Sequence, residues 1–171
     1  TQTRLWDPMG MEYDGAWALD SEESGFEKME AGLNARAIDY AKLGQLYLEG
    51  GSLDGTPIVP ESWVVESTVF DTAIGDVDYY PDEFGRLIYD DGDGWYGYLW
   101  YGKHRAGGPD DFYAEGDHGQ FVYVVPARGL VIVRSGTEFG IAGSAWVESC
   151  GCSTMSLPRD VAVSSHSALK R

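Results

Sequence analysis

A short polar stretch in the second half of the chain could do chemistry. It contains Glu115, Gly116, Asp117, His118, Gly119 and Gln120. An apolar run typical of a buried strand follows, so the stretch lies at the mouth of a predicted hairpin. A hairpin mouth can aim main-chain N–H groups at a ligand, and such donors stabilise the developing oxyanion of an acyl transfer. The residues alone favour a simpler interpretation, in which the two glycines only shape the turn.

The elements around this stretch predict an antiparallel meander of three or four strands. Short strands are expected near 112–115, 120–125 and 130–134, and Pro126 and Gly129 mark a turn between the last two. Upstream, the run 95–101 alternates as one strand would, which places Tyr96, Tyr98 and Trp100 on one face. Because that run is aromatic on both faces, we expect both faces to be covered.

Helices are predicted on either side of these strands. The clearest begins at Asn34 as its N-cap and stops at Gly50 and Gly51. Its small residues Ala37, Ala41 and Gly44 would let another element approach closely. A short helix follows Pro60, and another is expected over 140–149. The fold class is therefore α+β, an antiparallel sheet flanked by helices, in one partial domain over 1–151 with a polar, irregular tail over 152–171.

Metal sites and cofactors are not predicted. Cys150 and Cys152 form a lone C-x-C, which lacks the second ligand pair of a structural zinc site. Asp90, Asp91 and Asp93 resemble the start of a calcium loop, but the twelfth position from Asp91 is a glycine and not a bidentate acid. A solvated acidic loop is the better interpretation, and we expect no cofactor.

Charge and composition narrow the classes of partner. The chain has 171 residues and a formal net charge of −16, which argues against binding to nucleic acid or to an anionic membrane surface. The acids are scattered, as on a solubilising surface, although adaptation to salt would look similar. No apolar run is long enough to span a membrane. The cellular compartment stays open.

Longer segments of the chain resemble one family. They are "LWDPMGMEYDGAWALDSEESGFEKMEAGLNARAIDYAKLGQLYLEGGSLDGTPIVPESWV", "DGWYGYLWYG" and "FYAEGDHGQFVYVVPARGLVIVRSGTE". In order and spacing they resemble the middle-to-late part of the β-lactamase-related serine hydrolases, within the 6-aminohexanoate-dimer hydrolase and esterase branch. The resemblance runs roughly from Leu5 to Trp146. It implies the C-terminal part of the β-lactamase/transpeptidase-like fold.

The resemblance also implies roles for the polar stretch. In that family a Ser of an S-x-x-K motif attacks an ester or amide carbonyl, while the Lys and a Tyr move protons. A third motif borders the cleft, and here it falls on Ala114, Glu115 and Gly116. The main-chain N–H of Asp117 then completes the oxyanion hole, beside Gly116. The resemblance places six residues against the substrate: Glu115, His118, Gly119, Gln120, Tyr98 and Trp100.

This sequence departs from the family pattern in two ways. The third motif has no Lys, and Glu115 stands where a Thr is usual, which favours neutral esters or amides over substrates with the penicillin carboxylate. The S-x-x-K and Tyr motifs are expected upstream of Leu5 and are not in this sequence. The chain holds one S-x-x-K, from Ser167 to Lys170, and its polar tail setting indicates coincidence.

Two functions follow as alternatives. In the first, the chain is the C-terminal portion of a serine hydrolase, and an upstream polypeptide carries the Ser, Lys and Tyr motifs. In the second, it is a non-catalytic relative that acts as a scaffold or binding module. An incomplete core would favour association with that upstream polypeptide or with itself. A sugar-binding surface of Tyr96, Tyr98 and Trp100 is a third interpretation, supported only by composition.

Overall fold

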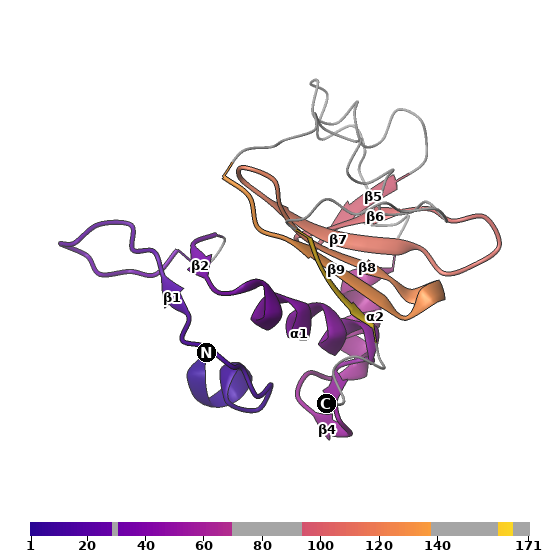
Figure 1. The fold of residues 1–171 in the computed structure, drawn as a ribbon, viewed down its shortest axis with the longest axis horizontal. Helices are drawn as coiled ribbons and strands as arrows, with labels where there is room; N and C mark the ends of the chain where they lie inside the picture. Colours follow the sequence, from indigo (N-terminus) through magenta and orange to yellow (C-terminus); the bar gives the residue numbers. More distant parts are fainter. Residues whose placement is uncertain (29–30, 70–93, 138–160, 166–171) are drawn as a thin grey trace.

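The computed structural model describes residues 1–28, 31–69, 94–137 and, for the backbone, 161–165 (Figure 1). Three predicted features lie outside these residues: the acidic loop with Asp90, Asp91 and Asp93, the helix over 140–149 with the two cysteines that follow it, and the Ser167–Lys170 motif. In the described part, no helix is long and apolar enough to cross a membrane.

Six antiparallel strands form the main sheet, in the order β10-β9-β8-β7-β6-β5. The list of strands is β5 (Gly94–Gly97), β6 (Trp100–Lys103), β7 (Asp111–Gly116), β8 (Gln120–Val125), β9 (Leu130–Arg134) and β10 (Val161–Ser165). The predicted strands near 112–115, 120–125 and 130–134 are confirmed. Strand β10 lies inside the tail that was expected to be irregular, so that expectation is wrong for these five residues.

The turn between β8 and β9 follows its sequence signals. Pro126–Arg128 forms one 3-10 turn, and Gly129 then takes a left-handed conformation, with φ 57°. Glycine adopts this conformation without the steric cost that a Cβ would add. The predicted hairpin of β8 and β9 is therefore closed by the proline and glycine that mark it in the sequence.

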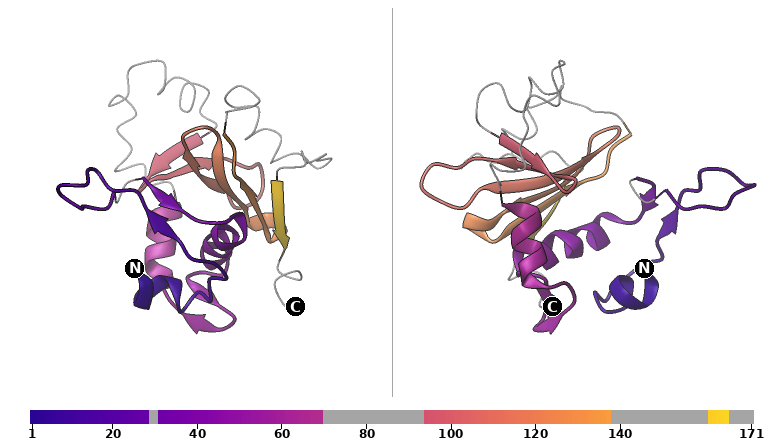
Figure 2. Two further views of the ribbon diagram at one scale, coloured as in Figure 1. Left: turned by 60° about the vertical axis from the view of Figure 1, so that its left-hand side comes forward. Right: turned by 180° about the vertical axis from the view of Figure 1, so that it is seen from behind.

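Helix α1 (Ala37–Leu48) covers one face of the sheet and contacts β8, β9 and β10 (Figures 1 and 2). It ends as predicted, because Gly50 donates to the carbonyl of Tyr47 at 3.2 Å and Gly51 to that of Leu46 at 2.8 Å. These two bonds form a Schellman motif. The predicted N-cap is wrong: Asn34 lies in a short strand, and Arg36 precedes the helix without a capping side chain.

The remaining elements are short. A π-helical turn (Gln2–Trp6) opens the chain, and β1 (Ala16–Trp17) pairs with β2 (Leu33–Asn34). A hairpin of β3 (Ser52–Leu53) and β4 (Thr56–Pro57) leads into helix α2 (Glu61–Thr68), which contacts β6. Val64 of α2 is buried as expected, whereas Trp63 is partly exposed.

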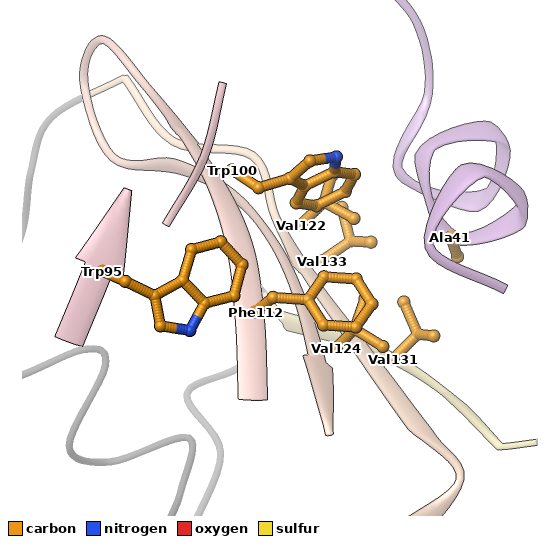
Figure 3. Close-up of a cluster of buried hydrophobic side chains, with 8 residues drawn as sticks. All are labelled: Ala41, Trp95, Trp100, Phe112, Val122, Val124, Val131 and Val133. Carbon is orange, nitrogen blue, oxygen red and sulfur yellow. The ribbon is translucent and has the colours of Figure 1, made fainter. Parts of the chain in front are cut away.

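The core between α1 and the sheet contains valines and aromatic rings, which Figure 3 shows facing Ala41 of the helix. Gly44 makes the close approach possible, because a Cβ at this position would lie 2.5 Å from Cγ1 of Val131 and 3.1 Å from Cγ1 of Val122. The predicted role of the small helix residues is therefore confirmed at Gly44. The α+β class, an antiparallel sheet with helices, is confirmed as well.

The hairpin of β5 and β6 depends on one cross-strand pair. Trp95 lies opposite Gly102 and is almost fully buried. A Cβ on Gly102 would lie 1.8 Å from Cε2 of Trp95, so the indole occupies the space above the glycine. The indole N–H also donates to Asp110 at 3.1 Å. Glycine is thus required at position 102 for a reason of packing.

We expect Gly102→Ala to lower the free energy of unfolding by about 3 kcal/mol, because the buried indole would be forced out of its position. Gly97→Ala is the matched control, since it lies in the same hairpin and a Cβ there meets nothing within 4 Å. Urea unfolding of both variants measures the difference. Equal stabilities for the two variants would show that Trp95 can repack at no cost.

Candidate active site

The predicted site residues lie in and beside the turn between β7 and β8. Gly116 pairs with Gln120, which leaves Asp117, His118 and Gly119 as a three-residue turn. His118 and Gly119 both have positive φ, at 62° and 75°. A left-handed histidine is uncommon, and the surrounding structure must hold it there. The structure thus brings together five of the predicted residues, from Gly116 to Gln120.

Strand β7 extends beyond its neighbour β6 at this end of the sheet. The pairing with β6 covers Asp111–Tyr113 only, whereas the pairing with β8 continues to Gly116. Within the described residues, the stretch from Ala114 to Gly116 therefore has no strand partner on the β6 side. Backbone groups of a strand point alternately to its two neighbours, so some donors and acceptors of this stretch face an unpaired edge.

The next main-chain donor along the chain is the N–H of Asp117. Among the described residues it finds no hydrogen-bond acceptor, and the residue is exposed. Gly116, just before it, adds no side chain over the unpaired edge. A Cβ placed on Gly116 would lie 3.4 Å from Cβ of Gln120, an ordinary contact. The fold does not require glycine at this position.

A network below the turn ties it to the end of β9. Arg134 donates through Nη1 to the carbonyl of Gly119 and, at 3.4 Å, to that of His118. The side-chain amide of Gln120 accepts from the N–H of Gly136 at 3.2 Å and donates to the carbonyl of the same residue. The sequence interpretation missed both Arg134 and Gly136. A charged residue ending the apolar run "LVIVR" was the available signal.

The two aromatic candidates are separated by a turn that the sequence did not predict. Tyr98 and Leu99 connect β5 and β6 with φ of 51° and 69°, so the expected continuous strand is wrong, and so is the shared face of Tyr96, Tyr98 and Trp100. Trp100 is buried, with its ring 4.7 Å from that of Tyr47. Burial in the core argues against the expected contact of Trp100 with substrate.

Tyr98 remains near the candidate site. Because β5 to β8 are consecutive antiparallel strands, the β5–β6 turn and the β7–β8 turn fall at the same end of the sheet. The Tyr98 side chain is fixed there, since its hydroxyl donates to Oε1 of Glu66 at 3.0 Å and its ring contacts Trp63 at 5.1 Å. Leu99 beside it is 62% exposed. The unpaired edge of β7 therefore has an apolar rim.

Glu115 carries the one shifted carboxyl of the candidate site for which the cause is clear. It pairs across the ladder with Phe121. Although part of the side chain is exposed, desolvation by its surroundings raises the pKa of the Glu115 carboxyl above its ordinary value. The ionised form is therefore disfavoured at the place where an oxyanion would develop.

A second polar cluster lies at the opposite end of the strands. Asp111 is buried and accepts from Nε of Arg105 at 2.6 Å and from the hydroxyl of Tyr123 at 3.0 Å. Arg105 also donates to the Tyr123 oxygen at 3.0 Å. Burial is the main cause that raises the pKa of Tyr123. The cluster fastens the β6–β7 loop to the sheet, and nothing links it to the turn at Asp117.

Metal binding finds no support in the part of the chain that the structure describes. No group of three or more His, Cys, Asp or Glu side chains there is arranged to hold an ion. An open hollow between the end of α1 and the start of α2 is lined by Glu49 and Glu61. It shares no residue with the candidate site.

Comparison with solved structures gives one informative likeness. The fold matches a protein described as "Putative 6-aminohexanoate-dimer hydrolase from Bacillus anthracis" with a TM-score of 0.62 and 28% sequence identity. The match covers 85% of this chain but 34% of the other, so the chain spans about a third of that protein's length. No family model and no curated protein matches the chain. The likeness supports a relationship to the β-lactamase-like hydrolases at the level of the fold.

We expect Glu115→Gln to stabilise the protein at neutral pH but not in acid. A carboxyl with a raised pKa in the folded state binds protons more tightly than in the unfolded chain, so stability falls as pH rises above the ordinary value of 4.5. The amide removes that loss. Thermal unfolding of the variant and the parent from pH 4 to 8 measures it.

Glu23→Gln is the control for this experiment, because it removes one exposed negative charge from the same acidic chain. Equal gains from both substitutions at neutral pH would mean that general charge repulsion, and not the desolvation of Glu115, is responsible.

Proposed function

We propose that this chain forms part of a serine hydrolase that cleaves esters or amides through an acyl-enzyme. The observation that carries the proposal is the unpaired edge of β7 at Ala114–Gly116, followed by the exposed N–H of Asp117. A carbonyl laid against this edge would receive a main-chain hydrogen bond as negative charge develops on its oxygen. The fold-level likeness to a hydrolase supports the same conclusion.

In this proposal the chain supplies binding and oxyanion stabilisation. The nucleophilic Ser, and the Lys and Tyr that move its proton, belong to a segment upstream of Leu5 and meet the β7 edge across the cleft. The Ser oxygen attacks the carbonyl, the leaving alcohol or amine takes a proton, and water then hydrolyses the acyl-enzyme. Desolvation favours the neutral form of Glu115, which limits the opposing charge beside the oxyanion.

The substrate class follows from the charges near the turn. The third-motif stretch carries Glu115 and the turn carries Asp117, with no lysine among the residues from Ala114 to Gln120. A substrate with a carboxylate at this point would be repelled. Neutral acyl groups fit better, with Leu99 and Tyr98 as the apolar rim.

Purification with mass analysis tests the assembly. The chain is expressed together with the segment encoded upstream, and the complex is assayed on p-nitrophenyl acetate. Hydrolysis and labelling of one upstream serine by a fluorophosphonate are the expected results. A stable complex that neither hydrolyses nor is labelled would instead favour a scaffold or binding role.

We expect the 171-residue chain on its own to show no hydrolysis by a serine mechanism. Its one S-x-x-K begins at Ser167 in a polar context, where no buried helix start is predicted to activate the serine. Incubation with a fluorophosphonate followed by intact-mass measurement tests this. Stoichiometric labelling of Ser167 would overturn our interpretation of the tail.

Two substitutions separate the backbone of the turn from its side chains in the active assembly. Gly116→Val should lower kcat/KM about a hundredfold, the cost of roughly one oxyanion donor, because a branched side chain crowds the carbonyl position. Asp117→Asn should be tolerated or mildly beneficial, since the N–H stays and the negative charge is removed. Steady-state kinetics on one ester compares them.

Retained folding is the control for both variants, and the ordinary contact available to a Cβ at Gly116 predicts it. Circular dichroism and thermal unfolding establish it. Loss of activity in Asp117→Asn together with a silent Gly116→Val would show that this turn is not the oxyanion element.

A further inference from the structure

Arg134 is a buried cation placed directly under the proposed oxyanion turn. It is the last residue of β9, and only 6% of its surface is exposed. Its Nη1 donates to the carbonyls of His118 and Gly119. A charge is costly to bury unless hydrogen bonds compensate it, so a contact of this kind must be specified by its surroundings.

The surroundings of the guanidinium are shaped to hold it. A Cβ on Gly136 would lie 2.4 Å from Nη1 and 2.8 Å from Cζ of Arg134, so only glycine leaves room for the group. Gln120 bonds to both the N–H and the carbonyl of Gly136, which fixes that glycine against the first residue of β8. Two ties from the end of β9 thus converge on the same turn.

The geometry of the peptide unit links these ties to the donors above. In a planar trans peptide the carbonyl and the following N–H point in opposite directions. Carbonyls of His118 and Gly119 that face the guanidinium therefore direct the N–H groups of Gly119 and Gln120 away from it. The same contacts hold the two successive positive φ angles, which fix the course of the chain after Asp117.

Charge gives a second reason for this arrangement. Glu115 and Asp117 stand beside the proposed oxyanion position, in a chain with a formal net charge of −16. Their carboxylates would oppose negative charge on a substrate oxygen. A buried guanidinium below the turn offsets that field from the protein side, where water does not screen it.

We infer that Arg134 is a positioning residue, which sets the β7–β8 turn and its main-chain donors for the reaction by binding the carbonyls of His118 and Gly119. The inference rests on the proposed function for its catalytic part. Its structural part concerns the turn alone and can be tested in the 171-residue chain.

The first measurement is 15N relaxation of the turn amides in the 171-residue chain. Arg134→Met should lower the order parameters of Asp117, His118 and Gly119 from the rigid range near about 0.85 to below about 0.6, while those of central β8 stay unchanged. Arg128→Met is the matched control, since it removes an exposed arginine at the other end of the same strands.

Gly136→Ala provides a second route in case Arg134→Met does not fold. It keeps the arginine and its charge but places a Cβ where the guanidinium lies. The same loosening of the turn is expected. Turn amides that stay rigid in whichever of these variants folds would overturn the inference.

The second measurement is kinetic and uses the assembly with the upstream segment. Arg134→Met should lower kcat about a hundredfold, because a small misplacement of the donors is costly, while KM changes much less. Added guanidinium ion should restore part of the rate to Arg134→Ala. A wild-type assembly without activity would refute the proposed function and leave the relaxation result to decide on the turn. A loosened turn with unchanged kcat would refute the positioning role while the hydrolase stands.

Discussion

The close contact between helix α1 and the sheet is the constraint on which the rest of the structure depends. Gly44 lets the helix approach until Val122 and Val131 would collide with any added carbon. That contact buries the valines of β8 and β9 and the aromatic rings of β6 and β7 on one face (Figure 3). Because strand residues alternate between faces, the register of the whole ladder is then fixed. A slip of one residue would turn the charged Arg134 toward the helix.

The fixed register also decides where the sheet offers unpaired backbone. Strand β6 is shorter than β7 because the chain turns at Tyr98 and Leu99, two bulky residues held at positive φ. Such a turn is strained, and the contacts of Tyr98 with Glu66 and Trp63 help to hold it. The strain leaves β7 unpaired at Ala114–Gly116. Local strain in one hairpin thus creates the edge from which the proposed function of the next hairpin derives.

Part of this could be predicted from the sequence. The strands from Asp111 to Arg134 follow from alternation and from the Pro126 and Gly129 signals, and the end of α1 follows from its two glycines. The turn at Tyr98–Leu99 could not be predicted, because turn chemistry normally shows Asn, Asp or Gly at positive φ. The proposed role of Asp117 came from a family resemblance. Arg134 and Gly136 were missed because their contacts reach across 15 or 16 residues of chain.

The arrangement also explains how an acidic chain could serve an oxyanion. Backbone N–H groups carry no net charge, so they stabilise developing negative charge without adding a cation that the surrounding carboxylates would bind. The charge that supports them is Arg134, which contacts peptide carbonyls from below and is nearly hidden from solvent. An exposed lysine at the motif would instead pair with Glu115 or Asp117. In this chain the cationic group lies under the turn, and the substrate side presents the main chain alone.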